Sequence, residues 1–335
     1  MAEKRLNIHD IAQMAGTSTA TVSNYLNGRF ERMSEATRER IAQVVHRTGY
    51  VPSAQAKDLA GSSSHVIAVI ILNNSNLWAG RVFTGIERVA QQAGYQTVIC
   101  NTGFSSATER AQVEKMLSLG VDGFIIQPTS HHRELRRLLE AARKPVVFFD
   151  FGYADVDCSW VRTDLYGAVY DATSSCVERG YDDFVVCAAP PGKMRSRVER
   201  MDGMADALAV RGLEARVVEM DENTADVQAL ERKLDAAIVP ARRTLVFCPH
   251  QWGLARLVKA LRSRRHLMPE RIGLLGINNE DWADLAEPGI STIIEPVEEE
   301  GELVCSILMG QLREPAAAPV QRILPCSTRW LASTL

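Results

Sequence analysis

Residues 10–28 read DIAQMAGTSTATVSNYLNG, and this stretch predicts two short helices joined by a turn. Asn7 and Asp10 have the spacing of a reciprocal helix cap, and apolar residues at helical spacing follow, which predicts a first helix over about residues 8–15. Gly16 can adopt the left-handed backbone conformation that commonly ends a helix. The chain is therefore expected to turn here before a second helix begins.

The second helix is expected over residues 19–26, with Ser18 as its N-cap. Its apolar residues are spaced to pack inward, so its hydroxyl and amide side chains must face outward. A helix N-terminus with unpaired N–H groups binds phosphate, and this end of the second helix of a helix-turn-helix enters the DNA major groove. A third helix is expected to begin at Ser34. A small helical domain whose exterior is simply polar would show the same spacing, so both interpretations stay open.

The segment YVPSAQAKDLAGSSS, which begins at Tyr50, favours DNA binding. Pro52 stops the third helix, and residues 53–59 can form one or two helical turns that would not be stable alone. Leu59 is the one large apolar residue of these turns. Insertion into a DNA minor groove would bury it, with Lys57 contacting the backbone or the groove. The alternative is a plain linker in which Leu59 packs on the next domain.

Together, TSTATVSNYLNG, RMSEATRERI, GYVPSAQAKDLAG and the strand that follows resemble the LacI/GalR family of bacterial transcriptional regulators. The resemblance runs over essentially the whole chain. It implies a homodimer on a pseudo-palindromic double-stranded DNA operator, hinge helices that order on DNA, and a sugar-sized effector that alters affinity. By position it implies base reading by Thr19, Ala20 and Asn24. It also implies DNA contacts by Ser18, Thr21, Ser23, Asn27, Ser34, Thr37, Lys57 and, as the intercalating leucine, Leu59.

This chain departs from the family pattern at two of these positions. Asn24 stands where many members have Arg, so a contact to adenine would replace one to guanine, because an Asn side chain pairs with adenine. Lys57 also stands where many members have Arg. The resemblance therefore predicts DNA binding but not the operator sequence.

From Val66 onward, apolar strands alternate with segments of helical period. One series runs from VIAVIIL to VVFFD, and a second runs from SWVRTD to IGLLGI. This alternation predicts an α/β fold with two doubly wound parallel sheets, a two-lobed core like that of periplasmic binding proteins. Ligands of such sheets bind beyond the carboxyl ends of the strands, so a cleft is expected between the lobes.

The predicted domains are a helix-turn-helix at 1–50, a hinge helix and linker at 51–64, and an effector-binding and dimerisation core at 65–335. Within the core, the N-subdomain is expected at about 65–155 and 295–322, and the C-subdomain at about 156–294 and 323–335. The chain is expected to cross between them near 151–158, 292–296 and 321–326, where one apolar block ends and another begins.

Polar and aromatic side chains at the strand ends suit a hydroxylated ring. A flat aromatic residue with converging hydrogen-bonding groups can hold a sugar, and arginine adds a bidentate grip on a carboxylate or on vicinal hydroxyls. Each residue has a structural alternative: Trp78 can lie in the core, and Asp150 or Asp164 can cap a helix. The predicted effector-binding residues are Asn76, Trp78, Gln127, Asp150, Asp164, Arg197, Arg200, His250 and Asn278.

The resemblance favours Arg200, Asn278 and Trp78 as effector contacts. His250 stands where members usually have Asn, and Asn278 stands where they usually have Asp, so the effector can differ from those of relatives. The segment WAGRVFTGIE and the pair Arg197 and Arg200 are most similar to the branch that responds to sugar acids such as ketodeoxygluconate and hexuronates.

The composition is that of a globular protein of more than one domain, with 46% apolar and 24% charged residues in 335. The net charge is −3, although the first 61 residues carry a small positive excess. Seven scattered cysteines without a Cys-x-x-Cys spacing predict buried, reduced thiols. The apolar run VIAVIIL is too short to span a bilayer, and MAEKRLNIHD does not have the pattern of a secretory signal, which predicts a cytoplasmic protein with no membrane partner.

Catalytic and phosphate-binding motifs are absent from the sequence: it contains no Gly-x-Gly-x-x-Gly, Gly-x-x-x-x-Gly-Lys-Ser/Thr, Gly-x-Ser-x-Gly or His-Glu-x-x-His. His131 and His132 have no evident third ligand and are expected to be solvated, so no metal or cofactor is expected. The sequence predicts an effector-controlled transcriptional regulator, a repressor in the first instance. The alternatives are an activator of the same architecture, or a cytoplasmic α/β sugar-binding protein or enzyme with an incidental helical cap.

Overall fold

The structure is a computed structural model, and it describes residues 6–26, 28–50, 63–75, 77–151, 157–190, 192, 194–221 and 226–335. The chain divides into two compact units, Met1–Ser64 and His65–Leu335.

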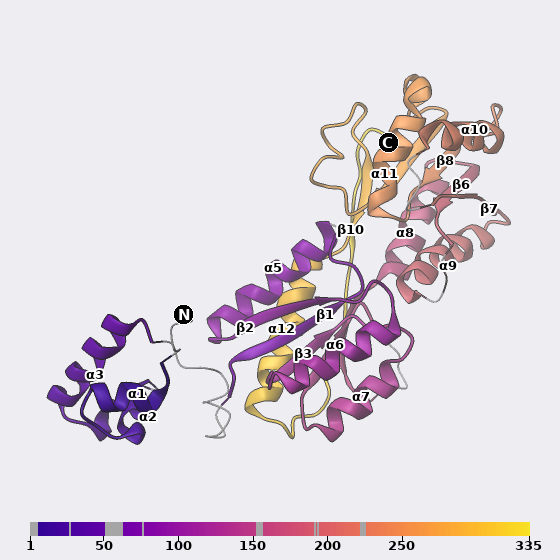
Figure 1. The fold of residues 1–335 in the computed structure, drawn as a ribbon. Coiled ribbons are helices and arrows are strands. Elements are labelled where there is room, and N and C mark those ends of the chain that lie inside the picture. Colours follow the sequence, from indigo (N-terminus) through magenta and orange to yellow (C-terminus); the bar gives the residue numbers. More distant parts are fainter. Residues whose placement is uncertain are drawn as a thin grey trace. The chain divides into compact units, whose positions relative to one another are not determined.

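The first unit is a small helical bundle, drawn in indigo in Figure 1. The predicted capping box is present: the Asn7 side chain accepts hydrogen bonds from the backbone N–H groups of His9 and Asp10, and the Asp10 carboxylate accepts one from the Asn7 N–H. Gly16, with φ +59°, separates the first two helices, and Val22 is buried against the others. The predicted helix-turn-helix is confirmed. Its elements are α1 (Ile8–Met14), α2 (Thr19–Leu26), η1 (Phe30–Arg32) and α3 (Glu35–Thr48).

The second unit contains two six-stranded sheets. The first sheet has the order β11-β5-β4-β3-β1-β2, and all its neighbouring strands are parallel. Its strands are β1 (Val66–Ile71), β2 (Gln96–Asn101), β3 (Gly123–Ile126), β4 (Val146–Phe149), β5 (Ser159–Thr163) and β11 (Gln321–Leu324). With α5 (Leu77–Gln92), α6 (Ser106–Ser118), α7 (His132–Ala141) and α12 (Val297–Arg313) it forms the first lobe.

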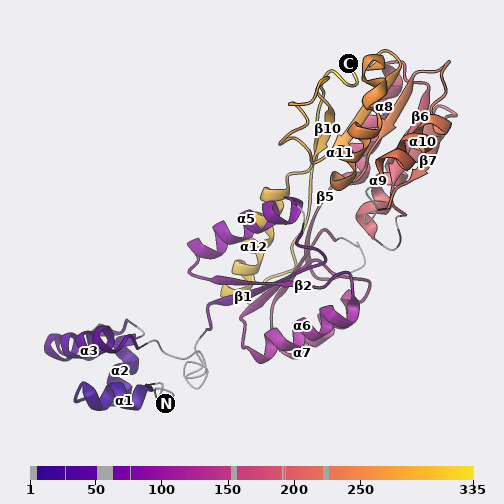
Figure 2. The same cartoon turned by 45° about the horizontal axis from the view of Figure 1, so that its top comes forward.

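Strand β1 is apolar throughout because helices cover both faces of its sheet. Ile67 and Val69 pack with residues of α5 and α12, whereas Ala68 and Ile70 pack with residues of α6 and α7. Figure 2 shows the two helix layers on opposite sides of β1 and β2. The parallel strands consequently end together at one edge of the sheet, where side chains are free to line a site.

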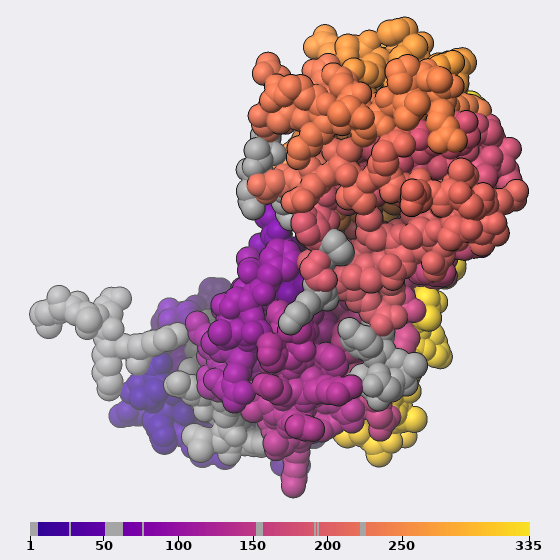
Figure 3. Space-filling model, turned by 90° about the vertical axis from the view of Figure 1, so that its right-hand side faces the viewer, coloured from indigo at the N-terminus to yellow at the C-terminus, as the bar shows by residue number. Residues whose placement is uncertain are grey.

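The second lobe repeats this plan around a sheet of order β12-β10-β9-β8-β6-β7. Figure 3 shows the purple and magenta residues of the first lobe and the salmon and orange residues of the second lobe as two masses of side chains. The strands of the second lobe are β6 (Asp183–Ala188), β7 (Ala215–Glu219), β8 (Thr244–Phe247), β9 (Ile272–Ile277), β10 (Ser291–Ile294) and β12 (Ser327–Arg329). Its helices are α8 (Leu165–Glu178), α9 (Arg195–Ala209), α10 (Val227–Ala237), α11 (Gln251–Ala260) and η2 (Arg262–Leu267).

Two details differ from the sequence prediction. First, β5 pairs with β4 and β11 in the first sheet, so a C-subdomain that begins at 156 is wrong, and the chain first crosses after Thr163. The break in the apolar pattern at 151–158 separates two strands of one sheet. Second, β12 is antiparallel to β10. Because β11 ends at the edge where both sheets meet, the strand that follows must run away from that edge.

Among the described helices, none has both the length and the apolar composition needed to cross a membrane. Six of the seven cysteines are buried, Cys326 is partly exposed, and all seven are free thiols.

Candidate functional site

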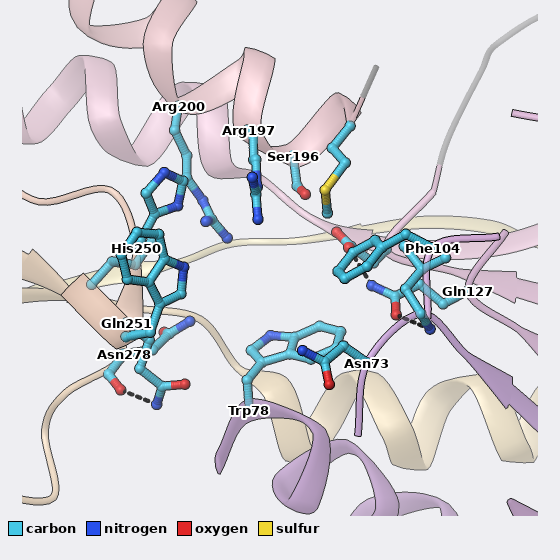
Figure 4. Close-up of a pocket in the computed structure, with 15 residues that line it drawn as sticks. Asn73, Trp78, Phe104, Gln127, Ser196, Arg197, Arg200, His250, Gln251 and Asn278 are labelled. Atoms are coloured by element: carbon cyan, nitrogen blue, oxygen red, sulfur yellow. Dashed lines mark hydrogen bonds between the residues drawn. The ribbon is translucent and has the colours of Figure 1, made fainter. Parts of the chain in front are cut away.

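Residues of both lobes at the carboxyl ends of the strands line a cavity (Figure 4). The first lobe contributes Leu72, Asn73, Trp78, Phe104, Gln127 and Asp150. The second lobe contributes Met194, Ser196, Arg197, Arg200, His250, Gln251, Trp252, Ile277 and Asn278. A neighbouring cavity shares Leu72, Phe104, Gln127, Asp150, Met194 and Ser196 with it, so the two form one continuous cleft.

The structure brings most of the predicted effector residues together in this cavity: Trp78, Gln127, Asp150, Arg197, Arg200, His250 and Asn278. Asp164 does not line it, which corrects the sequence prediction. The Asp164 carboxylate instead accepts a hydrogen bond of 3.0 Å from the Gly167 N–H and caps α8. Asn76 lies outside the described residues.

Several lining residues were missed by the sequence analysis. Asn73 and Gln251 follow the ends of β1 and β8 closely, so the rule that selected Gln127 and Asp150 would have found them. Phe104 follows β2 in the same way. Met194 and Ser196 lie at the start of α9, well after β6, and no pattern marked them.

Aromatic and cationic groups face each other across the cavity. Figure 4 shows Trp78, from α5, opposite Ser196, Arg197 and Arg200, which descend from α9. The Trp78 ring stacks with Phe149 at 6.2 Å between centroids, which fixes its orientation. A flat apolar surface opposite hydrogen-bond donors is suited to a sugar ring.

Arg200 is anchored by two acceptors. Its Nη1 donates to the Pro249 carbonyl oxygen at 2.8 Å, and its Nη2 donates to Glu295 Oε1 at 3.2 Å. Asn278 Nδ2 donates to the same oxygen of Glu295 at 2.5 Å. These contacts hold two cavity-lining side chains on one carboxylate.

Two carboxyl groups of the cavity region, those of Asp150 and Glu300, are shielded from solvent. Burial, and then the charge of Glu295, raise the pKa of Asp150 to about 7, against hydrogen bonding from Gln127. Gln127 Nε2 donates to Asp150 Oδ2 at 2.8 Å. Burial and the neighbouring Asp150 raise the pKa of Glu300 well above its ordinary value, and the Asp150 N–H donates to Glu300 Oε1 at 3.1 Å. Asp150 therefore titrates near neutrality inside the cavity.

His250 is neutral at physiological pH. Burial, then the charges of Arg200 and Arg197, lower its pKa to about 3. The Ala189 N–H donates to His250 Nε2 at 3.1 Å, so the single ring proton is on Nδ1. His250 consequently adds a hydrogen-bond donor to the site and no charge.

The start of α9 carries an excess of positive charge. Arg162 and Arg195 share one carboxylate, that of Glu199, at 2.8 and 2.7 Å. Arg200 pairs with Glu295, and Arg197 lines the same cavity. Two guanidinium groups, those of Arg197 and Arg200, thus line the cavity, and with Asp150 partly neutral the cavity is suited to an anionic ligand.

The predicted DNA-contacting residues that the structure describes in the first unit lie on α2 and at the start of α3, and those of α2 extend from Ser18, just before the helix, to Asn24 in its second half. Ser18 Oγ accepts from the Thr21 N–H at 3.1 Å, and Ser34 Oγ accepts from the Thr37 N–H at 3.3 Å. Ser18, Ala20 and Ser34 are exposed, whereas Thr19, Thr21, Ser23, Asn24 and Thr37 are half-buried. Asn27, Lys57 and Leu59 lie outside the described residues.

Known families match nearly the whole chain. The family described as bacterial regulatory proteins, lacI family, matches residues 7–53. Periplasmic binding proteins and sugar binding domain of LacI family matches residues 64–240, and periplasmic binding protein-like domain matches residues 173–334.

Individual proteins match along nearly their full length. The HTH-type transcriptional regulator PtxS of Pseudomonas plecoglossicida is 28% identical over 326 residues, which cover 96% of this chain and 93% of the relative. The HTH-type transcriptional repressor PurR of Vibrio atlanticus is 28% identical over 316 residues, 92% of each chain. The crystal structure of the lac repressor dimer bound to operator and the anti-inducer ONPF has the same fold, with a TM-score of 0.81, 19% identity, and coverage of 99% of this chain and 100% of that chain.

Proposed function

Because this chain belongs to the LacI family of bacterial regulatory proteins and is a DNA-binding transcriptional regulator, we propose that it is a repressor controlled by a sugar acid bound between its two lobes. As a member of a family of regulators it is not an enzyme. The similarity to the PurR repressor supports repression over activation. The observation that carries the effector class is that two arginines, Arg197 and Arg200, line the cavity opposite Trp78.

Each predicted cavity residue has a role in this proposal. The sugar ring stacks on Trp78, while Gln127, Asp150, Asn278 and the Nδ1–H of neutral His250 bind its hydroxyl groups. The effector carboxylate binds Arg197 and Arg200, because charge-assisted hydrogen bonds from guanidinium are the strongest that the cavity offers.

The DNA-binding part acts as a homodimer, because one recognition helix contacts too few bases and paired half-sites match two-fold symmetry. Thr19, Ala20 and Asn24, all on α2, read bases from the helix-turn-helix at residues 1–50. The hydroxyl groups at the caps of α2 and α3 bind phosphate. Lys57 and Leu59 enter the minor groove from the hinge at 51–64, and the protein works in the cytoplasm on chromosomal DNA.

The effector class is tested by calorimetric titration with matched acid and neutral sugars: D-galacturonate against D-galactose, and D-glucuronate against D-glucose, with 2-keto-3-deoxygluconate as a further acid. We expect at least one acid to bind about tenfold or more tightly than its neutral counterpart. Arg197→Gln should weaken the acid by roughly 10- to 100-fold, the value of a charged hydrogen bond, and leave the neutral sugar almost unaffected.

Arg211→Gln is the matched control, because Arg211 is exposed and follows the end of α9. It should leave both affinities unchanged. Equal binding of acid and neutral sugar, or an Arg197→Gln protein that binds acids normally, would contradict the proposed effector class.

A further inference from the structure

Glu295 lies in a segment that connects the two lobes. It follows the end of β10 at Ile294, in the second lobe, and precedes the start of α12 at Val297, in the first lobe. Its side chain is 1% exposed, although it does not line the cavity. A carboxylate at this depth is stabilised only when several donors satisfy it.

Three side chains donate to Glu295, and each comes from a different element. Oε1 accepts from Arg200 at 3.2 Å and from Asn278 at 2.5 Å, both of which line the cavity. Oε2 accepts from Thr163 Oγ1 at 2.7 Å. Thr163 ends β5, the last residue of the first lobe before the chain crosses to α8. One carboxylate therefore joins two cavity-lining residues to two of the segments that connect the lobes.

The charge of Glu295 acts on the same guanidinium that an anionic effector would use. Ion pairs are stronger in the low dielectric of a protein interior than in water, so Glu295 offsets much of the attraction that Arg200 exerts on a ligand. The other charged groups that face this pair are Arg197, Glu199 and Asp150, with Glu300 behind Asp150. An effector carboxylate that binds Arg200 must share it with Glu295.

We propose that Glu295 is a positioning residue that competes with the effector carboxylate for Arg200. This competition limits the affinity for acids. It also makes the hydrogen bonds of Glu295 in the connecting segments depend on whether an effector is bound. This inference rests on the proposed sugar-acid effector. When the effector carboxylate binds Arg200, the ion pair between Arg200 and Glu295 weakens. The hydrogen bonds of Glu295 with Thr163 and Asn278 then readjust. The readjustment occurs where the lobes are joined, which is where a hinge motion is determined.

The substitution Glu295→Gln tests the inference, because glutamine has nearly the same shape as glutamate and no charge. In Glu295→Gln, an amide oxygen at the Oε1 position keeps the donors of Arg200 and Asn278, and an amide nitrogen at the Oε2 position donates to Thr163 Oγ1 instead of accepting from it. Every contact is preserved while the charge is removed. The control is Glu299→Gln, which removes the same charge from an exposed residue in the first turn of α12.

The experiment measures binding of D-galacturonate and D-galactose to the full chain by calorimetry, and operator affinity with and without D-galacturonate. Glu295→Gln should bind the acid about tenfold more tightly than wild type, with D-galactose changed by less than about twofold. The effector-induced change in operator affinity should fall at least about threefold. Glu299→Gln should behave as wild type.

Three other results would each overturn the inference. If wild type binds the acid and Glu295→Gln does not change the ratio of acid to neutral affinity, the inference is overturned and the proposed effector class stands. If Glu295→Gln loses both sugars and melts at a lower temperature, Glu295 has a structural role alone. If wild type does not prefer the acid, the proposed effector class fails, and the inference falls with it.

Discussion

His250 and Asp150 show how burial adjusts single groups in the cavity in opposite directions. Burial disfavours the charged form of each, so the pKa of the imidazole falls to about 3 and that of the carboxyl group rises to about 7. Both residues are therefore neutral or partly neutral beside Arg197 and Arg200. Neutral Asp150 therefore adds no negative charge that would repel an anion from these arginines, and neutral His250 adds no positive charge.

The depressed pKa of His250 predicts a loss of stability in acid. The unfolded chain binds a proton near the ordinary histidine value of 6.5, whereas the folded chain does not until about pH 3. The stabilisation is thus present above pH 6.5 and is lost as the pH falls. Between pH 7.5 and 5 the free energy of unfolding of wild type should fall by about 2 kcal/mol more than that of His250→Asn. Urea unfolding at the two pH values measures this difference, and equal losses would contradict it.

The raised pKa of Asp150 predicts that affinity for an acidic effector falls as the pH rises through about 7. Ionised Asp150 adds a negative charge to the cavity, whereas neutral Asp150 does not. From pH 6 to pH 8 the affinity for D-galacturonate should fall roughly three- to tenfold, a moderate charge–charge interaction. In Asp150→Asn the affinity should stay level across this range. Titration calorimetry at both pH values checks this, and a level wild-type profile would count against it.

Asp150 and Asp164 show that a position directly after a strand does not by itself predict that a residue lines the cavity. Both follow a strand in the sequence, yet Asp150 lines the cavity and Asp164 caps α8. The sequence shows that a carboxylate stands at the right edge of the sheet. It does not show whether a helix N–H group binds that carboxylate or whether it lines an open cavity, because this depends on whether a helix begins directly after the strand, as α8 does after β5.

At the scale of elements, α5 and α12 pack so closely that glycine is required in both. A Cβ on Gly301 would overlap the carbonyl oxygen of Val82, and one on Gly85 would overlap that of Glu298. Both helices begin beside the cleft: α5 presents Trp78 to the cavity, and α12 follows Glu295. Their close packing makes one rigid support for Trp78 and for the connecting segment.

Gly301→Ala should therefore lower the free energy of unfolding of the core by about 3 kcal/mol or more, because backbone must move to admit the methyl group. Gly310→Ala, in the same helix, meets no atom within 4 Å and should instead stabilise by up to about 1 kcal/mol, since alanine is the better helix former. Denaturant unfolding of both proteins compares them. Similar effects of the two substitutions would show that the glycine contact does not control the packing.

The elements of the first unit could be predicted closely, because local chemistry determines their ends. The capping box at Asn7, the left-handed Gly16 and the cap Ser34 each define a helix boundary within a few residues. The assignment of β5 and the direction of β12 could not be predicted, because the sheet that a strand joins is decided by contacts far away in the sequence.

At the scale of the whole molecule, the chain joins a helix-turn-helix of the lacI family to a core that matches the sugar binding domain of that family. Coupling between the two sites is a difference in effector affinity between DNA-bound and free protein, and it is reciprocal. An effector that releases the operator must therefore bind less tightly to the protein–operator complex. Two lobes joined by three segments can provide the two states that such coupling requires.

The hinge is tested by Leu59→Ala. If the leucine is inserted between bases of the minor groove, its removal should weaken operator binding by roughly 10-fold or more, with binding to random DNA nearly unchanged. Fluorescence anisotropy with both DNAs measures the two affinities. Unaltered operator affinity would show that residues 51–64 act as a plain linker.

The most direct test is operator binding by the purified full chain, measured by anisotropy on its own upstream DNA and on shuffled DNA across a salt series, with and without the panel of sugar acids. We predict tight binding to the upstream DNA, at least about 10³-fold above shuffled DNA, a steep dependence on salt, and a change of affinity with one acid. Weak binding that is equal on both DNAs and indifferent to every acid would contradict this prediction.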